Sequence, residues 1–406
     1  MLNGITLRNF KAFAEVTVPL RRLTLLTGLN SSGKSTVLQA FALLQQTQAN
    51  LALGGYAFGL NGECVELGLG RDVRHEAWVD TTSSPGAIEI ELHSDVGDRG
   101  GAVRGWGFWS AEYQPDEDLL VLSPDFVPGV LLDRSGRELT PAERARYQDQ
   151  LYTLFDDMPD FDTTPPFHCG FQYLRADRIN PAVSYLRSTA VQSGFLGARG
   201  EHVVNYLRIH QDDEVAPALR HPGAHGNSLL RQAEAWLGLL CPGINLQAAG
   251  IDGTDAVRLS FSHGSAGLSS SNRYRPTNVG FGLTYVLPIV IACLTAKPGG
   301  LVLLENPEAH LHPRGQTAMA ELIARAASTG TQFIVESHSD HVLNGLRLAV
   351  KRQVLSPKEL QLLYFHTDGK GVKHVDPIEV RPSGAIEQWP AGFFDEWDTA
   401  LDELID

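Results

Sequence analysis

The sequence predicts an α/β protein with a mixed β-sheet. Three continuous apolar runs carry this prediction: "LTLL" from residue 23, "LVLL" from residue 301 and "FIV" from residue 333. Runs of this kind are typical of strands that are buried on both faces of a parallel sheet. Each run is followed by polar residues and then by a helix-compatible segment. Because the carboxyl ends of parallel strands face the ligand crevice, we expect the three strand ends to converge on one site.

Length and charge limit the classes of function. The chain has 406 residues, enough for two or three domains, and its 43% hydrophobic content is typical of a globular protein. The formal net charge is −14, which gives no global electrostatic attraction to nucleic acids or to anionic membranes. We therefore expect any nucleic-acid contact to be local or to be made through a partner.

The predicted location is the cytoplasm. The four cysteines (Cys64, Cys169, Cys241 and Cys293) contain no CxxC pair, which fits reduced, buried thiols better than a disulfide framework or a zinc site. The amino terminus has no apolar signal region, and the longest apolar stretch, near "YVLPIVIACL", is too short to span a bilayer. We expect no membrane contact.

The first apolar strand leads into a phosphate-binding motif. The segment "GLNSSGKS" obeys the pattern G-x-x-x-x-G-K-[ST] and stands between a strand and a helix-compatible run. Backbone N–H groups would surround the phosphates, Lys34 would reach the β- and γ-phosphates, and the Ser35 hydroxyl would ligate Mg²⁺. The predicted nucleotide-binding residues are Gly28, Asn30, Ser31, Ser32, Gly33, Lys34, Ser35 and Thr36. A plain strand-to-helix turn is the alternative.

The two later strands supply candidate catalytic groups. Glu305 ends the strand in "GGLVLLENPEAHLHP", where a carboxylate would serve, with Ser35, as a Mg²⁺ ligand. His338 follows the strand in "TQFIVESHSDHV" and is the candidate γ-phosphate sensor. A purely structural histidine is the alternative.

At this point the sequence resembles a known group. The segments "ITLRNFKAF", "LTLLTGLNSSGKST", "NVGFGLTYVLPIV", "LLENPEAHLHP" and "VESHSDHVLNGLR" resemble ABC-type ATPase heads of the RecF, SMC and OLD kind. The most similar are predicted bacterial ATPases with a C-terminal domain of unknown function, whose end resembles "GAIEQWPAGFFDEWDTALDEL". The resemblance is weak between about residues 77 and 165. It implies an ABC-type P-loop ATPase head with a mixed β-sheet, an antiparallel β insertion and a helical subdomain, binding ATP and Mg²⁺.

The resemblance also implies a dimer or a higher homo-oligomer. In such heads each ATP lies between the P-loop of one protomer and a signature segment of the other. By position this segment is "NVGFGLTYVLP", where Gly280 and Gly282 precede an apolar helix that would point its N-terminus at a phosphate. The segment departs from the usual Leu-Ser-Gly-Gly-Gln. Glycines that allow close packing at a buried helix start are the alternative.

A second departure concerns catalysis. Where ABC enzymes have Asp-Glu, this chain has Glu305 and Asn306. An amide orients water but cannot take its proton, so Glu308 becomes the nearest candidate for a water-activating carboxylate. His310 and His312 have an i, i+2 spacing that does not match the i, i+4 face of a zinc helix. We expect slow hydrolysis, suited to a switch rather than a motor.

The predicted organisation has four parts. Residues 1–76 form an amino-terminal lobe, with a strand-like stretch from 60 to 78. Residues 77–170 form a β-rich insertion with one helix from Pro141. Residues 171–368 form a carboxyl-terminal lobe, which includes the arginine segment Arg175–Arg187 at the nucleotide side and an amphipathic helix opened by Asn227. Residues 369–406 form a family-specific tail.

Two classes of function stay in contention. The first is a dimeric nucleotide switch that controls a separate effector, such as a nuclease in a bacterial anti-phage operon. The second is an OLD-like nuclease or DNA-repair ATPase that acts on DNA directly. A nuclease needs a further cluster of carboxylates after the His338 region, and the sequence there contains none on successive strand ends, so the switch is favoured. A small-molecule P-loop kinase is disfavoured, because such kinases have no counterpart of "ENPEAHLHP".

Overall fold

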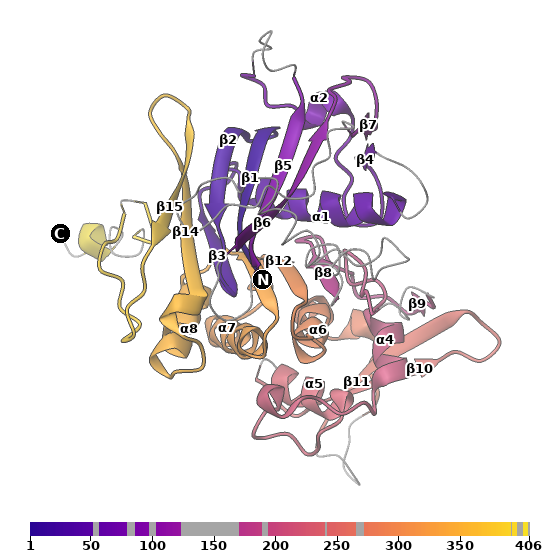
Figure 1. The fold of residues 1–406 in the computed structure, drawn as a ribbon. Coiled ribbons are helices and arrows are strands. Elements are labelled where there is room, and N and C mark those ends of the chain that lie inside the picture. The colour runs from indigo at the N-terminus through magenta and orange to yellow at the C-terminus, as the bar shows by residue number, and fades with distance from the viewer. Residues whose placement is uncertain are drawn as a thin grey trace. The chain divides into compact units, whose positions relative to one another are not determined.

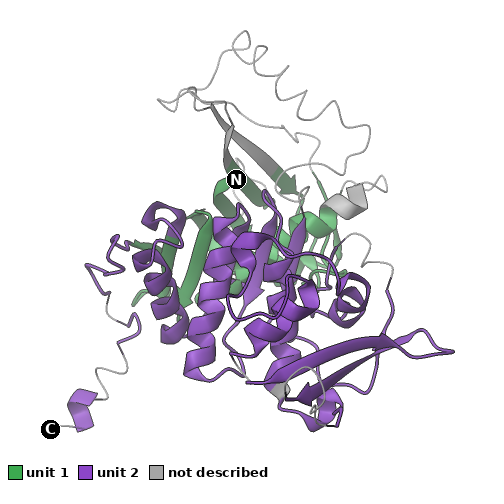
Figure 2. Cartoon of the chain, turned by 90° about the horizontal axis from the view of Figure 1, so that it is seen from below, with its two compact units in different colours: residues 1–169, 361–378 green, residues 170–360, 379–406 purple. Residues whose placement is uncertain are grey.

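The computed structural model describes residues 1–51, 57–78, 86–96, 103–122, 170–188, 194–239, 242–264, 272–390, 392–395 and 401–404. The chain forms two compact units: residues 1–169 with 361–378 make unit 1, and residues 170–360 with 379–406 make unit 2 (Figure 2). The predicted helix from Pro141, Cys169 and Cys241 lie outside the described residues. The four-part division stays a prediction.

Unit 1 contains a four-stranded antiparallel sheet in the order β2-β1-β5-β6 (Figure 1). Its strands are β1 (Leu2–Phe10), β2 (Phe13–Pro19), β5 (Ile88–Val96) and β6 (Val103–Ala111). The central strand β1 is buried along most of its length, with Ile5 and Leu7 fully buried. Strand β5, which falls in the segment predicted to be β-rich, pairs directly with β1.

The P-loop of unit 1 follows the buried strand β3 (Leu23–Gly28) and leads into helix α1 (Lys34–Leu51). In the same sheet, β3 lies next to β14 (Leu360–Thr367), and β14 pairs on its other side with β15 (Lys373–Ile378). Two short strands, β4 (Ala57–Gly59) and β7 (Leu119–Val121), pair with each other.

The strand-like prediction for residues 60–78 is wrong. Most of this stretch forms turns, and it contains the short helix α2 (Gly70–Val73). The Asp72 carboxylate accepts a hydrogen bond from the Leu69 N–H, and Gly68 has a left-handed φ of 86°. A local side-chain cap of this kind competes with strand pairing, which explains why the apolar residues here do not extend a sheet.

Unit 2 is built on three parallel strands, with β12 (Leu301–Glu305) between β8 (Phe171–Leu174) and β13 (Gln332–Glu336). Leu301–Leu304 and all of β13 are buried, as the apolar runs predict. Helices α6 (Phe281–Leu294), α7 (Pro313–Ser328) and α8 (Asp340–Lys351) lie side by side in Figure 1. Together the two units confirm the predicted α/β class with parallel and antiparallel pairing.

A smaller part of unit 2 combines two helices with a second sheet. Helices α4 (Val203–His210) and α5 (Leu229–Leu237) lie beside the sheet β10-β11-β9, made of β10 (Ile244–Gly250), β11 (Ala256–His263) and β9 (Tyr185–Leu186). The predicted amphipathic helix is confirmed as α5, although its N-cap is Ser228 rather than Asn227. None of the described helices is both long and apolar enough to cross a membrane.

Candidate nucleotide-binding site

Unit 1 gives the P-loop a backbone that side chains would obstruct. Gly28 and Gly33 have φ values of 132° and 103°, in the region that favours glycine. A Cβ atom on Gly28 would collide with the Phe365 carbonyl, and one on Gly33 would collide with the Phe13 ring. The two motif glycines therefore serve both the turn and the close packing of the loop.

The Lys34 side chain is held inside the loop. It is only 3% exposed, and its ammonium donates to the carbonyls of Gly28 (3.1 Å) and Leu29 (2.7 Å). The Ser32 hydroxyl donates to the same Leu29 carbonyl at 2.7 Å. The Lys34 ammonium and the N-terminus of helix α1 both carry positive charge at this loop, which fits the binding of an anionic phosphate group.

The remaining predicted P-loop residues lie around this cation. Asn30 and Ser31 are exposed, and Ser31 has a left-handed φ of 63°. Ser35 lies in the first turn of α1, and the Thr36 N–H donates to the Gly33 carbonyl at 3.1 Å. Unit 1 thus brings together the whole predicted set from Gly28 to Thr36.

The turn between β1 and β2 matches no sequence motif, yet it packs near the P-loop. Asn9 and Lys11 both have left-handed φ values, of 52° and 46°, and burial lowers the pKa of Lys11. Ala12 and Phe13, next in the chain, contact Gly33. The turn therefore places a partly desolvated cation close in sequence to residues that pack on the P-loop. An asparagine that ends an apolar strand in "LRNFKAF" is a signal for such a turn.

In unit 2, Glu305 is held by two donors. The Tyr173 hydroxyl donates to its Oε1 atom at 2.5 Å, and the Ala176 N–H donates to its Oε2 atom at 2.9 Å. Burial and the neighbouring Glu305 raise the pKa of Tyr173 well above its ordinary value, so the phenol stays a donor. Each carboxylate oxygen retains a lone pair, so this donor set is compatible with a divalent cation.

Arg178 organises the end of this strand. Its buried guanidinium donates to the carbonyls of Glu305 (2.6 Å), Asn306 (2.7 Å), Arg175 (2.9 Å) and Tyr285 (3.1 Å). It also lies 4.3 Å from the centre of the Tyr285 ring. Burial lowers the pKa of Arg178 to about 10. The resemblance implies that this arginine segment borders the nucleotide, and this stays a prediction. In the structure Arg178 holds the backbone that carries Glu305 and Asn306.

Glu308 is bonded to the segment that carries His338. Its Oε2 accepts from the Ser337 hydroxyl at 2.8 Å, and its Oε1 accepts from the His338 N–H at 3.0 Å. The Asn306 amide lies 3.5 Å from Oε1. The His338 side chain is 36% exposed, and its Nε2 is 4.0 Å from Glu336. Unit 2 therefore brings Glu305, Asn306, Glu308 and His338 together.

The two signature glycines differ in their surroundings. Gly280 is the N-cap of α6, and a Cβ there would meet nothing within 4 Å. Gly282 was predicted to precede the helix, and this is wrong, because it lies in the first turn of α6. A Cβ atom there would be 2.8 Å from the His310 carbonyl oxygen. This contact gives Gly282 a packing role, while Gly280 has open space in front of it.

The two histidines after Glu308 have local roles. The His310 ring packs edge-on against Tyr285, with 4.7 Å between ring centres. His312 is the N-cap of α7, and its side chain accepts from the Arg314 N–H. Among the described residues, no group of three or more His, Cys, Asp or Glu side chains could hold a metal ion.

Comparisons with known families match segments of both units. Residues 1–82 match the model of a family described as "AAA ATPase domain". Residues 252–344 match one described as "AAA domain, putative AbiEii toxin, Type IV TA system". Residues 355–404 match one described as "Protein of unknown function (DUF3696)". The two AAA segments contain the P-loop and the Glu305 to His338 region. No curated protein matches the chain in sequence.

Solved structures of SMC heads resemble the chain at low sequence identity. The first, "Crystal structure of the SmcHead bound to the C-winged helix domain of ScpA", is 15% identical and covers 94% of this chain and 98% of that chain, with a TM-score of 0.48. The SMC head domain from Thermotoga maritima is 13% identical and covers 93% and 99%, with a TM-score of 0.41. An Smc head with an extended coiled coil, bound to the C-terminal domain of ScpA derived from Pyrococcus furiosus, is 13% identical and covers 100% and 99%, with a TM-score of 0.42.

Proposed function

We propose that this protein binds ATP with Mg²⁺, hydrolyses it slowly and acts as a dimeric nucleotide switch that controls a partner effector. The observation that carries the nucleotide part is the buried Lys34 ammonium inside a glycine-framed loop at the start of α1. The AAA family matches over residues 1–82 and 252–344 support an ATPase of this general kind.

The residues divide the work in the following way. The P-loop N–H groups and Lys34 bind the β- and γ-phosphates. Ser35 and Glu305 would hold Mg²⁺, which neutralises charge on the phosphates when it is bound. His338 would contact the γ-phosphate from its own strand end. Tyr173 and Arg178 keep Glu305 in place, the first through its carboxylate and the second through its carbonyl.

We expect slow hydrolysis because of Asn306 and Glu308, the two side chains that are candidates for activating the attacking water. Asn306 replaces the usual glutamate, and an amide cannot accept the water's proton. Glu308, the nearby carboxylate, accepts hydrogen bonds from Ser337 and from the His338 N–H. Both of its carboxylate oxygens are therefore already engaged by donors of the chain, which leaves fewer lone pairs for the water. A long-lived ATP state suits a timer or switch.

The effector is a separate protein, and we propose a nuclease that serves bacterial anti-phage defence. The resemblance to defence-type ATPases supports this, as does a family description that names a toxin–antitoxin system for residues 252–344. We place the protein in the cytoplasm as a homo-oligomer of at least two copies.

Purification of the tagged protein from its native operon, with and without ATP, tests the switch. We expect one co-eluting protein whose activity depends on the nucleotide. If the isolated chain cleaves DNA by itself with Mg²⁺, the separate-effector proposal is wrong. If Lys34→Ala hydrolyses ATP as fast as the wild type, the ATPase proposal is wrong.

A further inference from the structure

The outer face of the β10–β11 pair in unit 2 is polar along its length. On β11, Val257, Leu259 and Phe261 point inward and are buried, so the alternate residues point outward. The outward residues are Arg258, Ser260 and Ser262 on β11, opposite Ala249, Gln247 and Asn245 on β10. Ser260, in the middle of the face, is only 9% exposed. This face joins one arginine to two hydroxyls and two amides.

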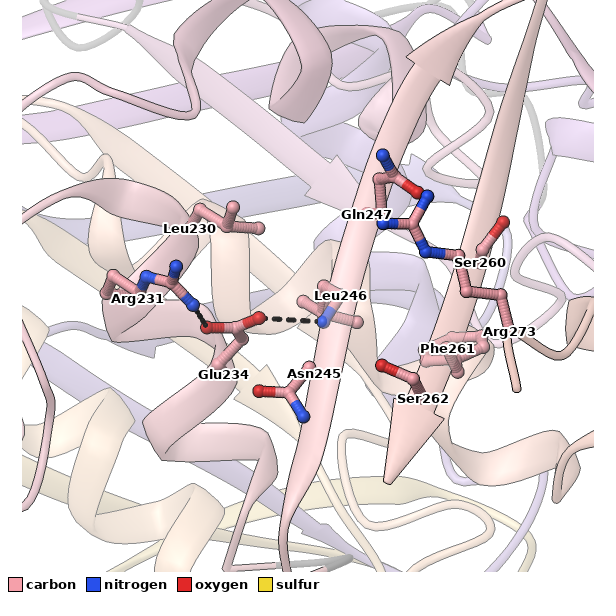
Figure 3. Close-up of a pocket in the computed structure, with 10 residues that line it drawn as sticks. All are labelled: Leu230, Arg231, Glu234, Asn245, Leu246, Gln247, Ser260, Phe261, Ser262 and Arg273. Atoms are coloured by element: carbon pink, nitrogen blue, oxygen red, sulfur yellow. Dashed lines mark hydrogen bonds and ion pairs between the residues drawn. The ribbon is translucent and has the colours of Figure 1, made fainter. Parts of the chain in front are cut away.

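A groove of about 230 Å³ runs over this face (Figure 3). In Figure 3 Arg231 and Glu234 of α5 stand on one side of it, and Gln247, Ser260 and Arg273 on the other. Glu234 is neutralised, because one oxygen accepts from Arg231 at 2.8 Å and the other from the Leu246 N–H at 2.8 Å. The carboxylate in the groove wall is therefore already satisfied.

Further positive charge lies along the edge of the face. Tyr274 pairs with Phe261, so Arg273 and Arg275 alternate to the outer side, where both are exposed. Arg258 is exposed too. Within the part of the chain that the structure describes, Arg258, Arg273 and Arg275 form no ion pair, so their charges are available to a ligand.

We propose that this face, with Arg273 in the groove wall and Arg258 and Arg275 beside it, binds the phosphate backbone of a nucleic acid. Guanidinium, hydroxyl and amide groups are the side chains that contact phosphate oxygens. The outward positions from Arg258 to Ser262 span about 13 Å at about 3.3 Å per residue, which is the length of about four nucleotides of one duplex strand.

An acidic protein segment fits this face less well. Protein interfaces depend on buried aromatic or aliphatic anchors. Three apolar residues border the groove: Leu246 and Phe261 are only 5% and 1% exposed, and Leu230 is half-buried, so a protein partner finds a single aliphatic side chain and no aromatic anchor there. Because the net charge of the chain is −14, the contact depends on these local arginines and not on long-range attraction.

Fluorescence anisotropy with a labelled 20-base-pair DNA duplex, across salt concentrations, tests the proposal. Three phosphate contacts contribute a slope of about −2.7 to log K against log salt, so a fourfold rise in salt weakens this part of binding about 40-fold. Each single change, Arg258→Gln, Arg273→Gln or Arg275→Gln, should flatten the slope by about 0.9. Arg352→Gln, an exposed arginine at the C-cap of α8 that pairs with Glu321, is the control and should leave the slope unchanged.

Two results would overturn the proposal. One is a triple arginine variant with the wild-type salt slope and affinity. The other is tighter binding of labelled polyglutamate than of the duplex, lost in the triple variant, which would assign the face to an acidic protein. Melting temperature and DNA-free ATP hydrolysis should stay unchanged in the triple variant. These readouts keep the outcome separate from that of the proposed ATPase activity.

Discussion

Three non-glycine residues of the candidate site have a left-handed backbone: Ser31 at φ 63°, Asn306 at φ 43° and His310 at φ 63°. Such conformations cost about 1–3 kcal/mol each and persist where the surroundings impose them. Asn306 is fixed from both sides, since its N–H donates to the Glu336 carbonyl at 2.9 Å and its own carbonyl accepts from Arg178. Strain of this kind indicates that the backbone after Glu305 is held in one geometry.

Lys34→Ala tests the P-loop. With Mg²⁺ and ATP at about 100 times the dissociation constant, the wild-type protein should gain about 2.7 kcal/mol of unfolding free energy. Lys34→Ala should lose most of this gain, because in the proposed function the buried Lys34 ammonium binds the phosphates. Thermal-shift measurements check it, with GTP as the control, since the chain has no Asn-Lys-x-Asp guanine-reading motif. Equal ATP-induced thermal shifts in the wild type and in Lys34→Ala would show that the P-loop is not the nucleotide-binding site.

Glu305→Gln and Glu308→Gln should differ. The first removes the proposed Mg²⁺ ligand, so Mg²⁺-dependent ATP binding and turnover should both fall. The second should spare ATP binding and lower turnover, whether Glu308 accepts the water's proton or fixes the His338 segment through its bonds to Ser337 and the His338 N–H.

The pH profile separates these two roles of Glu308. If Glu308 is the base, the acid limb of kcat against pH should disappear in Glu308→Gln. If Glu308 positions His338, the limb should persist at a lower rate, and Ser337→Ala should reproduce part of the loss. Normal turnover in Glu308→Gln would mean that Asn306 or a residue of a partner, and not Glu308, positions the attacking water.

At the scale of elements, Arg178 joins three parts of unit 2: the segment after β8, helix α6 and the end of β12. Arg178→Met keeps much of the apolar stem but leaves four carbonyls without this donor. We expect a loss of about 3 kcal/mol of unfolding free energy. Arg175→Met is the control and should cost less than about 1 kcal/mol, because Arg175 pairs with the half-exposed Asp177. Urea unfolding measures both, and equal costs would contradict the role of Arg178.

Gly345 sits where α8 meets α7. A Cβ at this position would lie 2.6 Å from the Ala320 Cβ and 3.0 Å from the Thr317 carbonyl. Gly345→Ala gains about 1 kcal/mol of helix propensity, but overpacking costs about 1–3 kcal/mol, so we expect net destabilisation. Gly369→Ala, with nothing within 4 Å, should be neutral within about 0.5 kcal/mol. A stabilised Gly345→Ala protein would show that the helices can separate at no cost.

The elements that the sequence predicts well are those whose pattern is local. The strands that end at Gly28, Glu305 and Glu336 each combine an apolar run with a polar end, and all three are observed. Pairings between distant segments could not be predicted, because nothing near β3 in the sequence indicates that β14, more than 300 residues later, is its neighbour. For the same reason the hydrogen bonds of Arg178 could not be predicted, because its partners Tyr285 and Glu305 lie more than 100 residues away in the sequence.

Site residues follow the same division. The P-loop was predictable as a whole because its function resides in contiguous backbone. The packing role of Gly282 depends on the His310 carbonyl, and the hydrogen bonds of Glu308 depend on Ser337, so neither could be read from a motif. These contacts form only when separate strand ends and helix starts are brought together by folding.

At the scale of the whole molecule, we predict that ATP joins two copies of the chain through two composite sites. A P-loop satisfies the phosphates from one side, and the N-terminus of α6 on a second copy would complete them. Gly280 is the position to change, because a side chain there has open space, whereas one at Gly282 would strike the His310 carbonyl and disturb folding. Gly280 also has φ −53° and ψ 136°, which other residues adopt easily.

Gly280→Asp should therefore fold, since aspartate is a favoured N-cap, yet it would place a negative charge against a phosphate twice per dimer. We expect ATP binding to the monomer to survive, while nucleotide-dependent association and hydrolysis fail together. Gly280→Asn has nearly the same shape without the charge and should retain both. Light scattering with a non-hydrolysable ATP analogue measures association. If the wild-type protein has the same mass with and without the analogue, its assembly is constitutive and not gated by ATP. If Gly280→Asp hydrolyses ATP normally, the N-terminus of α6 does not face the nucleotide.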